Sequence, residues 1–301
     1  MASKKKTAGK TAARLQELNK ALETENGVIA IVKTYDVKIG ENGHAFVTIE
    51  SVRPVFHATD GNSKTGKAGN YNLPIEYTCK HNAPCYQTAA CYACNGCYNF
   101  HDNQAMYSEN LKFFMLASDE EFISAVVAFI DENRLQLFRY FTCGDIPNTR
   151  FLFLMTEIAK RRPAVKFWSY TKKYEIVNNF LKSGKTLPEN LVIVFSHWLN
   201  DDGTYFPMEN PFNLPTSEYI PMGKEYLAES VTHVCPCSNP ESIETCATCD
   251  HPCYTLKPGE SMALMEHSTG RTKERDRELK ARKAEKKAAA KSAKKAEKAK
   301  K

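Results

Sequence analysis

Long hydrophobic runs are missing from this chain of 301 residues. No segment approaches the ~20 consecutive apolar residues that a membrane-spanning helix needs. The first six residues (MASKKK) lead into polar sequence, without the apolar core of a secretory signal. No internal repeat is visible either, so nothing indicates a repeat architecture. We therefore expect a cytoplasmic protein with no membrane partner.

Acidic charge is scarce at the two ends of the chain. Residues 271–301 carry fifteen Lys and Arg against five Asp and Glu, and residues 1–26 carry six against three. The whole chain has a net charge of +6, which leaves −7 for residues 27–270. We expect a basic N-terminal helix or arm (1–26), a folded body (27–270) and a disordered or helical Lys/Ala-rich tail (271–301). The tail is expected either to contact nucleic acid non-specifically or only to increase solubility.

Hydrophobic patterning predicts an α/β body. A β-hairpin is expected from strands at 27–35 and 45–49, and an exposed loop from 60 to 73. Strands are expected at 135–142, 165–170 and 191–196, and helices at 103–116, 118–133, 150–162 and 174–183. Ser118 and Glu121 form a capping-box pattern. Alternating strands and helices imply a parallel sheet, which we expect to form a partial or complete TIM-like barrel.

Polar residues follow three of these strands. The pairs are Gly144-Asp145 and Thr171-Lys172, and Ser196-His197-Trp198 follows the third strand. Because chemistry gathers at the carboxyl ends of parallel strands, we expect these groups to form a site. For Asp145 alone, capping of the next helix is an equally good interpretation. Arg139 lies within a strand and should meet an anion in a cavity or reach a solvent-exposed edge.

Ten of the eleven cysteines fall in two short clusters. The first cluster is Cys79, Cys85, Cys91, Cys94 and Cys97, and the second is Cys235, Cys237, Cys246, Cys249 and Cys253. In a reducing compartment such clusters indicate metal ligands rather than disulfides. Cys143 stands alone, which is more typical of a small buried side chain than of a ligand.

In the second cluster, the C-x-x-C turn of Cys246 and Cys249 is followed by Cys253 three residues later. Cys235 would supply a fourth thiolate, and Cys237 is an alternative to it. His233 and His251 could replace a thiolate. Four thiolates suit tetrahedral zinc or a [4Fe–4S] cluster, and the spacing does not distinguish the two.

The first cluster has more cysteines than one tetrahedral site needs. Cys79, Cys85 and Cys91 form one possible triad, and Cys91, Cys94 and Cys97 form a tighter one. Aromatic residues surround the segment and would shield a cluster from water. A structural zinc loop is the alternative interpretation.

Four features, taken in order, resemble the phage-encoded gene product 88 family over about residues 55–267. They are Gly61-Asn62-Ser63-Lys64, the run Cys79…Cys85…Cys91-Tyr92-Ala93, Arg139…Gly144-Asp145, and Cys235…Cys246-x2-Cys249-x3-Cys253. This resemblance implies a bacteriophage protein that acts in the cytoplasm of the host cell.

A more distant similarity is to radical S-adenosylmethionine (radical SAM) enzymes. It implies that Cys79, Cys85 and Cys91 hold a [4Fe–4S] cluster and that Gly144 and Asp145 contact S-adenosylmethionine. The second cluster would then match an auxiliary site. The spacing departs from that superfamily, in which three and then two residues separate the cysteines, whereas here five and five do.

The leading hypothesis is therefore an iron–sulfur enzyme, radical SAM-like, with an unknown small-molecule or macromolecular substrate. Arg139, Asp145, Thr171 and Lys172 are its candidate catalytic residues, with Arg139 and Lys172 holding negative charge. The alternative is a non-catalytic zinc protein that binds nucleic acid through its tail. A third interpretation is an electron carrier or thiol redox protein, which would leave the polar strand ends unexplained.

Overall fold

The computed structural model describes residues 36–39, 45–48, 54–62, 64–87, 91, 93, 98, 100–200, 203–220, 231–238, 242 and 244–265. The predicted arm (1–26), the strand at 27–35, the tail (271–301), Cys94 and Cys97 lie outside these residues. In the described part of the chain, no helix combines the length and the apolar character needed to cross a bilayer.

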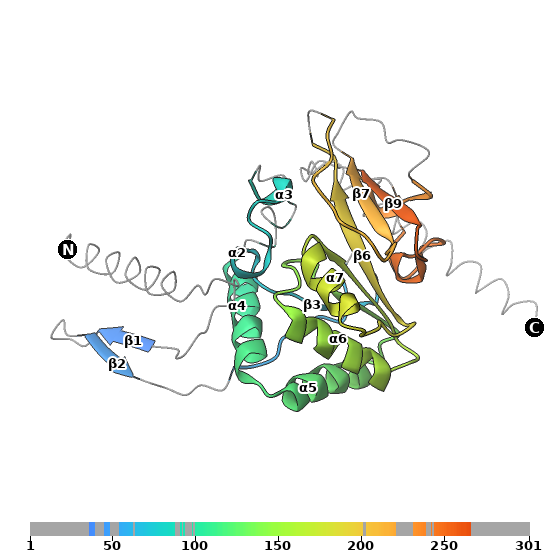
Figure 1. Cartoon of the computed structure of the whole chain (residues 1–301). Helices are drawn as coiled ribbons and strands as arrows, with labels where there is room; N and C mark the ends of the chain where they lie inside the picture. The colour runs from blue at the N-terminus through green and yellow to red at the C-terminus, as the bar shows by residue number, and fades with distance from the viewer. Residues whose placement is uncertain are drawn as a thin grey trace, which may run out of the picture.

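The core of the fold is a seven-stranded sheet in which every neighbouring pair is parallel (Figure 1). Its order is β3-β4-β5-β6-β7-β9-β8. The strands are β3 (Gly69–Tyr71), β4 (Leu137–Tyr140), β5 (Lys166–Thr171), β6 (Leu191–Trp198), β7 (Thr216–Ile220), β9 (Ser261–Met265) and β8 (His233–Val234). The predicted parallel α/β fold is confirmed. The predicted loop at 60–73 is wrong over 69–71, where buried β3 forms the edge of the sheet.

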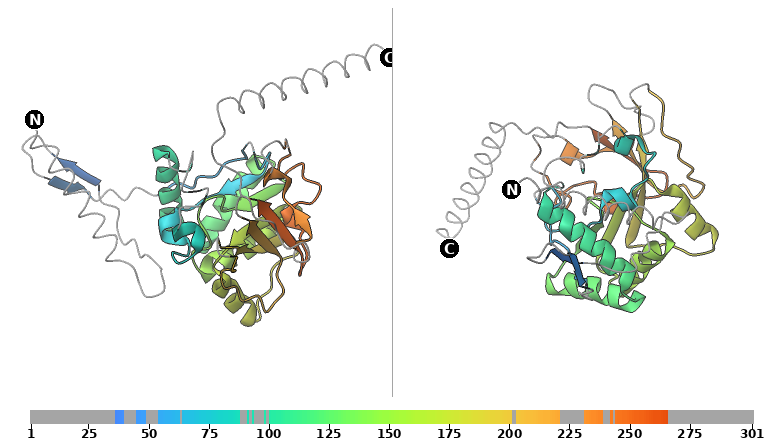
Figure 2. Two further views of the ribbon diagram at one scale, coloured as in Figure 1. Left: turned by 90° about the horizontal axis from the view of Figure 1, so that it is seen from above. Right: turned by 90° about the vertical axis from the view of Figure 1, so that its left-hand side faces the viewer.

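A barrel is not shown. Among the described strands, β3 and β8 pair with one neighbour each, so the sheet is open at both edges. Closure would require these two edges to pair with each other or through further strands. Figure 1 and the left view of Figure 2 both place α4 at one end of the body and β9 at the other.

The helices alternate with the central strands as predicted. They are α2 (Ile75–Thr78), α3 (Pro84–Gln87), α4 (His101–Leu116), α5 (Asp119–Glu132), α6 (Thr149–Arg161) and α7 (Tyr174–Lys182). The Ser118–Glu121 capping box is confirmed at the start of α5. Asn148 caps α6 through its side chain, which accepts a hydrogen bond from the Phe151 amide. Asp145 is therefore not the helix cap.

The predicted hairpin is present in part. β1 (Asp36–Ile39) and β2 (Ala45–Thr48) pair antiparallel, outside the main sheet. The second strand agrees with the prediction. The first strand begins after residue 35, which is the last residue of the predicted strand.

The two faces of the sheet are covered differently. On β6, Leu191, Ile193 and Phe195 point into the large core beneath the helices. Val192 and Val194 alternate with them and face the cysteine-rich C-terminal segment. This segment contains two short 3-10 helices, η3 (Pro236–Ser238) and η4 (Cys253–Thr255). Helices thus cover one face of the sheet and cysteine-bearing turns cover the other. Because both faces are covered, the strands are almost continuously apolar.

Candidate metal centres and strand-end site

The three predicted strand ends meet. The carboxylate of Asp145 accepts hydrogen bonds from the Lys172 backbone amide (2.9 Å) and the Ile146 amide (2.7 Å). The Lys172 ammonium donates to the Ser196 hydroxyl at 2.8 Å. It also lies 5.2 Å from the centre of the Trp198 ring. These contacts join the ends of β4, β5 and β6 into one polar group, the strand-end site. Thr171 is the last residue of β5, and Ser196 and Trp198 lie within β6, rather than after these strands as predicted.

Asp145 is buried, with 6% of its surface exposed. Burial raises the pKa of its carboxyl group, and hydrogen bonds from the Thr171 hydroxyl and the Lys172 and Ile146 amides oppose that rise. The carboxylate already accepts hydrogen bonds from three donors. Its role is therefore structural: it holds the strand ends together and fixes the backbone of Lys172. The ammonium of Lys172 is the more accessible group.

Gly144 is required by close packing. Its φ is +89°, and a Cβ atom there would lie 2.5 Å from the Leu73 carbonyl oxygen. Thr78 accepts a hydrogen bond from the Asp145 amide at 3.1 Å. A side chain at position 144 would therefore clash with Leu73 and Thr78, in the segment that leads into the first cysteine cluster.

Three cysteines of the first cluster lie beside the strand-end site. Burial raises the pKa of the Cys79 thiol, and the nearby Asp145 charge raises it further, followed by Cys91 and Cys85. Burial also raises the pKa of Cys85, while the charge of Lys172 lowers it. The Cys91 amide donates to the Cys85 carbonyl at 3.2 Å. The predicted triad is thus brought together and placed at the carboxyl edge of the sheet.

Cys143 is a further member of this group that sequence reasoning missed. It is 1% exposed and packs in one apolar cluster with Cys79 and Cys91. Its charge also contributes to the raised pKa of Cys79. The signal that could have predicted this is its position at a strand end, two residues before Asp145.

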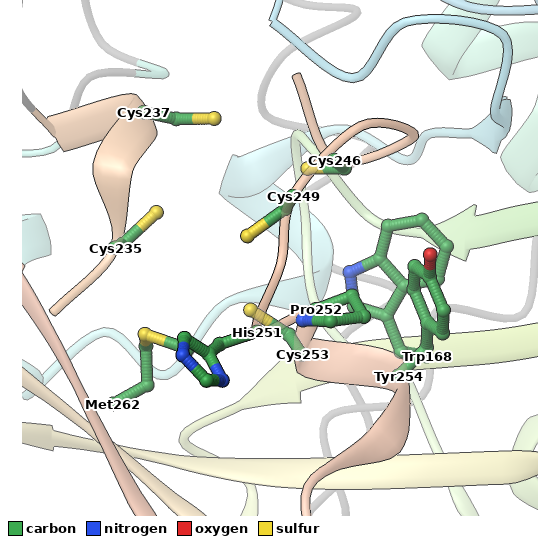
Figure 3. A pocket seen from close by; sticks show the side chains of 10 residues that line it. All are labelled: Trp168, Cys235, Cys237, Cys246, Cys249, His251, Pro252, Cys253, Tyr254 and Met262. Atoms are coloured by element: carbon green, nitrogen blue, oxygen red, sulfur yellow. The ribbon is translucent and has the colours of Figure 1, made fainter. Parts of the chain in front are cut away.

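The five cysteines of the second cluster line one pocket. Figure 3 shows their sulfur atoms pointing into a shared space. The other lining residues are Trp168, His251, Pro252, Tyr254 and Met262. The predicted ligands Cys235, Cys246, Cys249 and Cys253 are therefore together, and so is the alternative Cys237. None of the nine described cysteines forms a disulfide bond.

Donors from the sheet surround this pocket. The Tyr170 hydroxyl donates to the Cys253 sulfur at 2.7 Å. The Arg139 guanidinium lies 5.1 Å from the centre of the Tyr170 ring. A hydrogen bond from Cys237 lowers the pKa of the Cys246 thiol to about 7; burial opposes this, and the charge of Arg139 contributes to it. Arg139, predicted to meet an anion in a cavity, thus faces the second cysteine cluster.

Histidine rings lie at the margin of the same pocket. His251 lines it, and the ring of His233 stacks on His251 with the centroids 4.4 Å apart. Both were predicted as substitutes for a thiolate. Their stacking places two imidazoles beside the thiols, on β8 and on the turn that leads into η4.

The loop before β3 holds the second cluster. The Cys246 amide donates to the Lys64 carbonyl (3.0 Å) and the Ala247 amide to the Thr65 carbonyl (3.2 Å). Gly66 has a φ of +67°, and a Cβ atom there would lie 2.6 Å from the Thr245 hydroxyl oxygen. This loop was predicted to be exposed. Its glycine and carbonyls instead anchor the second cluster.

The donor set of the second pocket fits a thiolate-bound metal group in number and chemistry. Within the described residues, however, no three His, Cys, Asp or Glu side chains form a group that could hold a metal ion. The indole nitrogen of Trp168 is buried in the pocket wall and has no hydrogen-bond partner in the described structure. An electron-rich group among the sulfurs would supply the missing acceptor.

Comparison with known proteins gives one family. No curated protein and no solved structure matches the chain. The similarity to radical SAM enzymes stays a prediction, because no comparison supports it. The family model of gene product 88 matches residues 52–206, just over half of the chain. This match includes Cys79, Cys85, Cys91 and Asp145, whereas the second cysteine cluster lies beyond it. The chain belongs to the gene product 88 family.

Proposed function

We propose that this protein binds iron–sulfur clusters at both cysteine sites and that the first site is catalytic. The observation that carries the proposal is the meeting of Cys79, Cys85 and Cys91 with Lys172 and Asp145 at the carboxyl edge of a parallel sheet. Ligand and cofactor sites in parallel α/β folds lie at this edge. The proposed reaction class is radical chemistry with S-adenosylmethionine.

Three thiolates are the basis of this assignment. A cubane cluster held by three cysteines keeps one iron open, and that open iron is what would supply electron transfer to S-adenosylmethionine. The Lys172 ammonium is suited to hold the carboxylate of that cofactor. Asp145 positions Lys172 by accepting its backbone amide, and Ser196 orients the ammonium.

Apolar packing supports the site further. Ile75 and Tyr107 are buried against Cys79 and Cys91. Such a lining excludes water and oxygen from a cluster and influences its potential. The position of Cys143 in the same lining gives a thiol that either completes the wall or substitutes for one ligand.

The second candidate function is a zinc-binding protein that contacts nucleic acid through residues 271–301. The observation in its favour is the four-cysteine spacing at Cys235, Cys246, Cys249 and Cys253, together with the basic tail. Structural zinc would then hold the C-terminal turns against the sheet. Deletion of residues 271–301 would abolish salt-sensitive binding to DNA or RNA.

The deciding experiment is metal and sulfide analysis of protein purified without oxygen, with a visible absorption spectrum. Two [4Fe–4S] clusters predict about eight iron and eight sulfide per chain. About two zinc per chain with no iron and no colour would overturn the proposal and favour the alternative.

The cofactor assignment needs a matched pair of variants. Lys172→Ala should weaken binding of S-adenosylmethionine at least tenfold in calorimetry, because it removes the charge that would hold the carboxylate. Lys173→Ala removes a neighbouring charge and should leave binding unchanged. Equal affinities of the two variants would remove Lys172 from the site.

A further inference from the structure

The wall of the second cysteine pocket contains a hydrogen-bond donor that lacks an acceptor. Trp168 is 1% exposed, and its indole nitrogen is buried without a partner in the described structure. Figure 3 shows this nitrogen on the side of the ring that faces the cysteines. A buried N–H without an acceptor is unfavourable, whereas nearly all such groups in folded proteins are satisfied. The natural acceptor in this pocket is sulfur.

A second donor comes from the same strand. Tyr170 lies two residues after Trp168 on β5, so the two side chains point to the same face of the sheet. Its hydroxyl already donates to the Cys253 sulfur at 2.7 Å. Trp168 and Tyr170 thus approach the thiols from one strand, while the cysteines come from the residue after β8, from η3 and η4, and from the turn between these two helices.

A cation lies behind these donors. Arg139 of β4 is in register with Trp168 of β5, and its guanidinium lies over the Tyr170 ring. The pocket therefore combines several thiols with two neutral donors and one positive charge. Such surroundings stabilise added negative charge on a sulfur-ligated group more than they stabilise its oxidised form.

We propose that the group held by the second cysteine cluster is redox-active and that Trp168 and Tyr170 raise its reduction potential by donating hydrogen bonds to its sulfur atoms. This inference rests on the proposed binding of an iron–sulfur cluster at this site. The step is the uptake of one electron from an external one-electron donor, without making or breaking a covalent bond. Trp168 and Tyr170 are positioning residues, and they are not ligands.

The test is a potentiometric titration of the full chain with its clusters in place, followed by electron paramagnetic resonance. The first site is emptied by the triple variant Cys79→Ser, Cys85→Ser, Cys91→Ser, so that the signal comes from the second site alone. In this background Trp168→Phe and Tyr170→Phe should each lower the ratio of reduced to oxidised cluster about tenfold at a fixed potential. This corresponds to a reduction potential that is lower by about 59 mV.

Tyr254→Phe is the matched control. Tyr254 lines the same pocket and its ring lies 5.2 Å from Trp168, but Figure 3 shows its hydroxyl pointing away from the sulfur atoms. Its removal should leave the potential unchanged. Tyr170→Phe removes only the hydroxyl group and keeps the ring. It therefore still tests the inference if the Trp168 variant does not fold.

The outcomes separate this inference from the proposed function. Iron and sulfide are measured on each sample before the titration. A cluster at full occupancy whose potential is the same in the parent and in both donor variants would overturn the inference alone. Zinc without iron in the second pocket would overturn both.

Discussion

Substitution of Gly66 by alanine tests the contact between the loop before β3 and the second cysteine cluster. Gly66 has a φ of +67°, so alanine there loses about 1 kcal/mol of unfolding free energy to backbone strain alone. The added Cβ atom would also lie 2.6 Å from the Thr245 hydroxyl oxygen and 2.9 Å from the Ala247 Cβ atom. Overpacking of this kind costs about 1–3 kcal/mol more.

Gly184 provides the control for backbone strain. Its φ is +81°, and a Cβ atom there would meet nothing within 4 Å. Gly184→Ala should therefore lose only the backbone contribution of about 1 kcal/mol. The difference between the two variants isolates the contact with the turn that contains Cys246.

Two assays read this difference. In urea unfolding, Gly66→Ala should be less stable than Gly184→Ala by about 1–3 kcal/mol, which corresponds to a Tm lower by about 2–12 °C. Metal content should fall only in Gly66→Ala, because the displaced turn starts at the residue before Cys246. Equal stability and equal metal content in the two variants would refute this role of the loop.

Two further predictions concern the body of the fold. Asn72→Ala should lower the free energy of unfolding by about 2–4 kcal/mol in urea titrations, because the Asn72 side chain accepts hydrogen bonds from the buried Thr142 and Cys143 amides. In the control, substitution of the exposed Asn179 by alanine should change the free energy of unfolding by less than about 0.5 kcal/mol. Similar losses in the two variants would contradict this role of Asn72. Hydrogen bonds from Arg161 and Ser124 lower the pKa of Glu120 from 4.5 to about 2, so its contribution to stability is present above pH 4.5 and is lost as the pH falls towards 2. Glu120→Gln should flatten the pH dependence of unfolding over that interval, and a profile parallel to that of the parent protein would exclude this ion pair as a source of acid sensitivity.

The central elements could be predicted because their signals are local. Ser118 and Glu121 define the start of α5 within four residues, and the apolar run at Leu191 has no competing pattern. The strand-end site could also be predicted, because parallel strands place their carboxyl ends at one edge whatever their order in the sheet. Asp145 and Lys172 meet for this reason.

The missed features depend on contacts between distant segments. Cys143 joins Cys79 and Cys91 only when the chain folds over the end of β4. Strands β7, β8 and β9 were not predicted, since they are two to five residues long and β7 contains the buried Glu218. Nothing in the sequence around Lys64 and Thr65 indicates that their carbonyl groups accept hydrogen bonds from the amides of Cys246 and Ala247.

The order of the last strands has a consequence for synthesis on the ribosome. β9 lies between β7 and β8, although it comes last of the three in the chain. Among the described strands β8 pairs only with β9, so the segment bearing Cys235 and Cys237 has no place on the sheet until Ser261–Met265 has left the exit tunnel. A nascent chain halted before residue 261 would therefore lack the strand that holds this cysteine-bearing segment on the sheet.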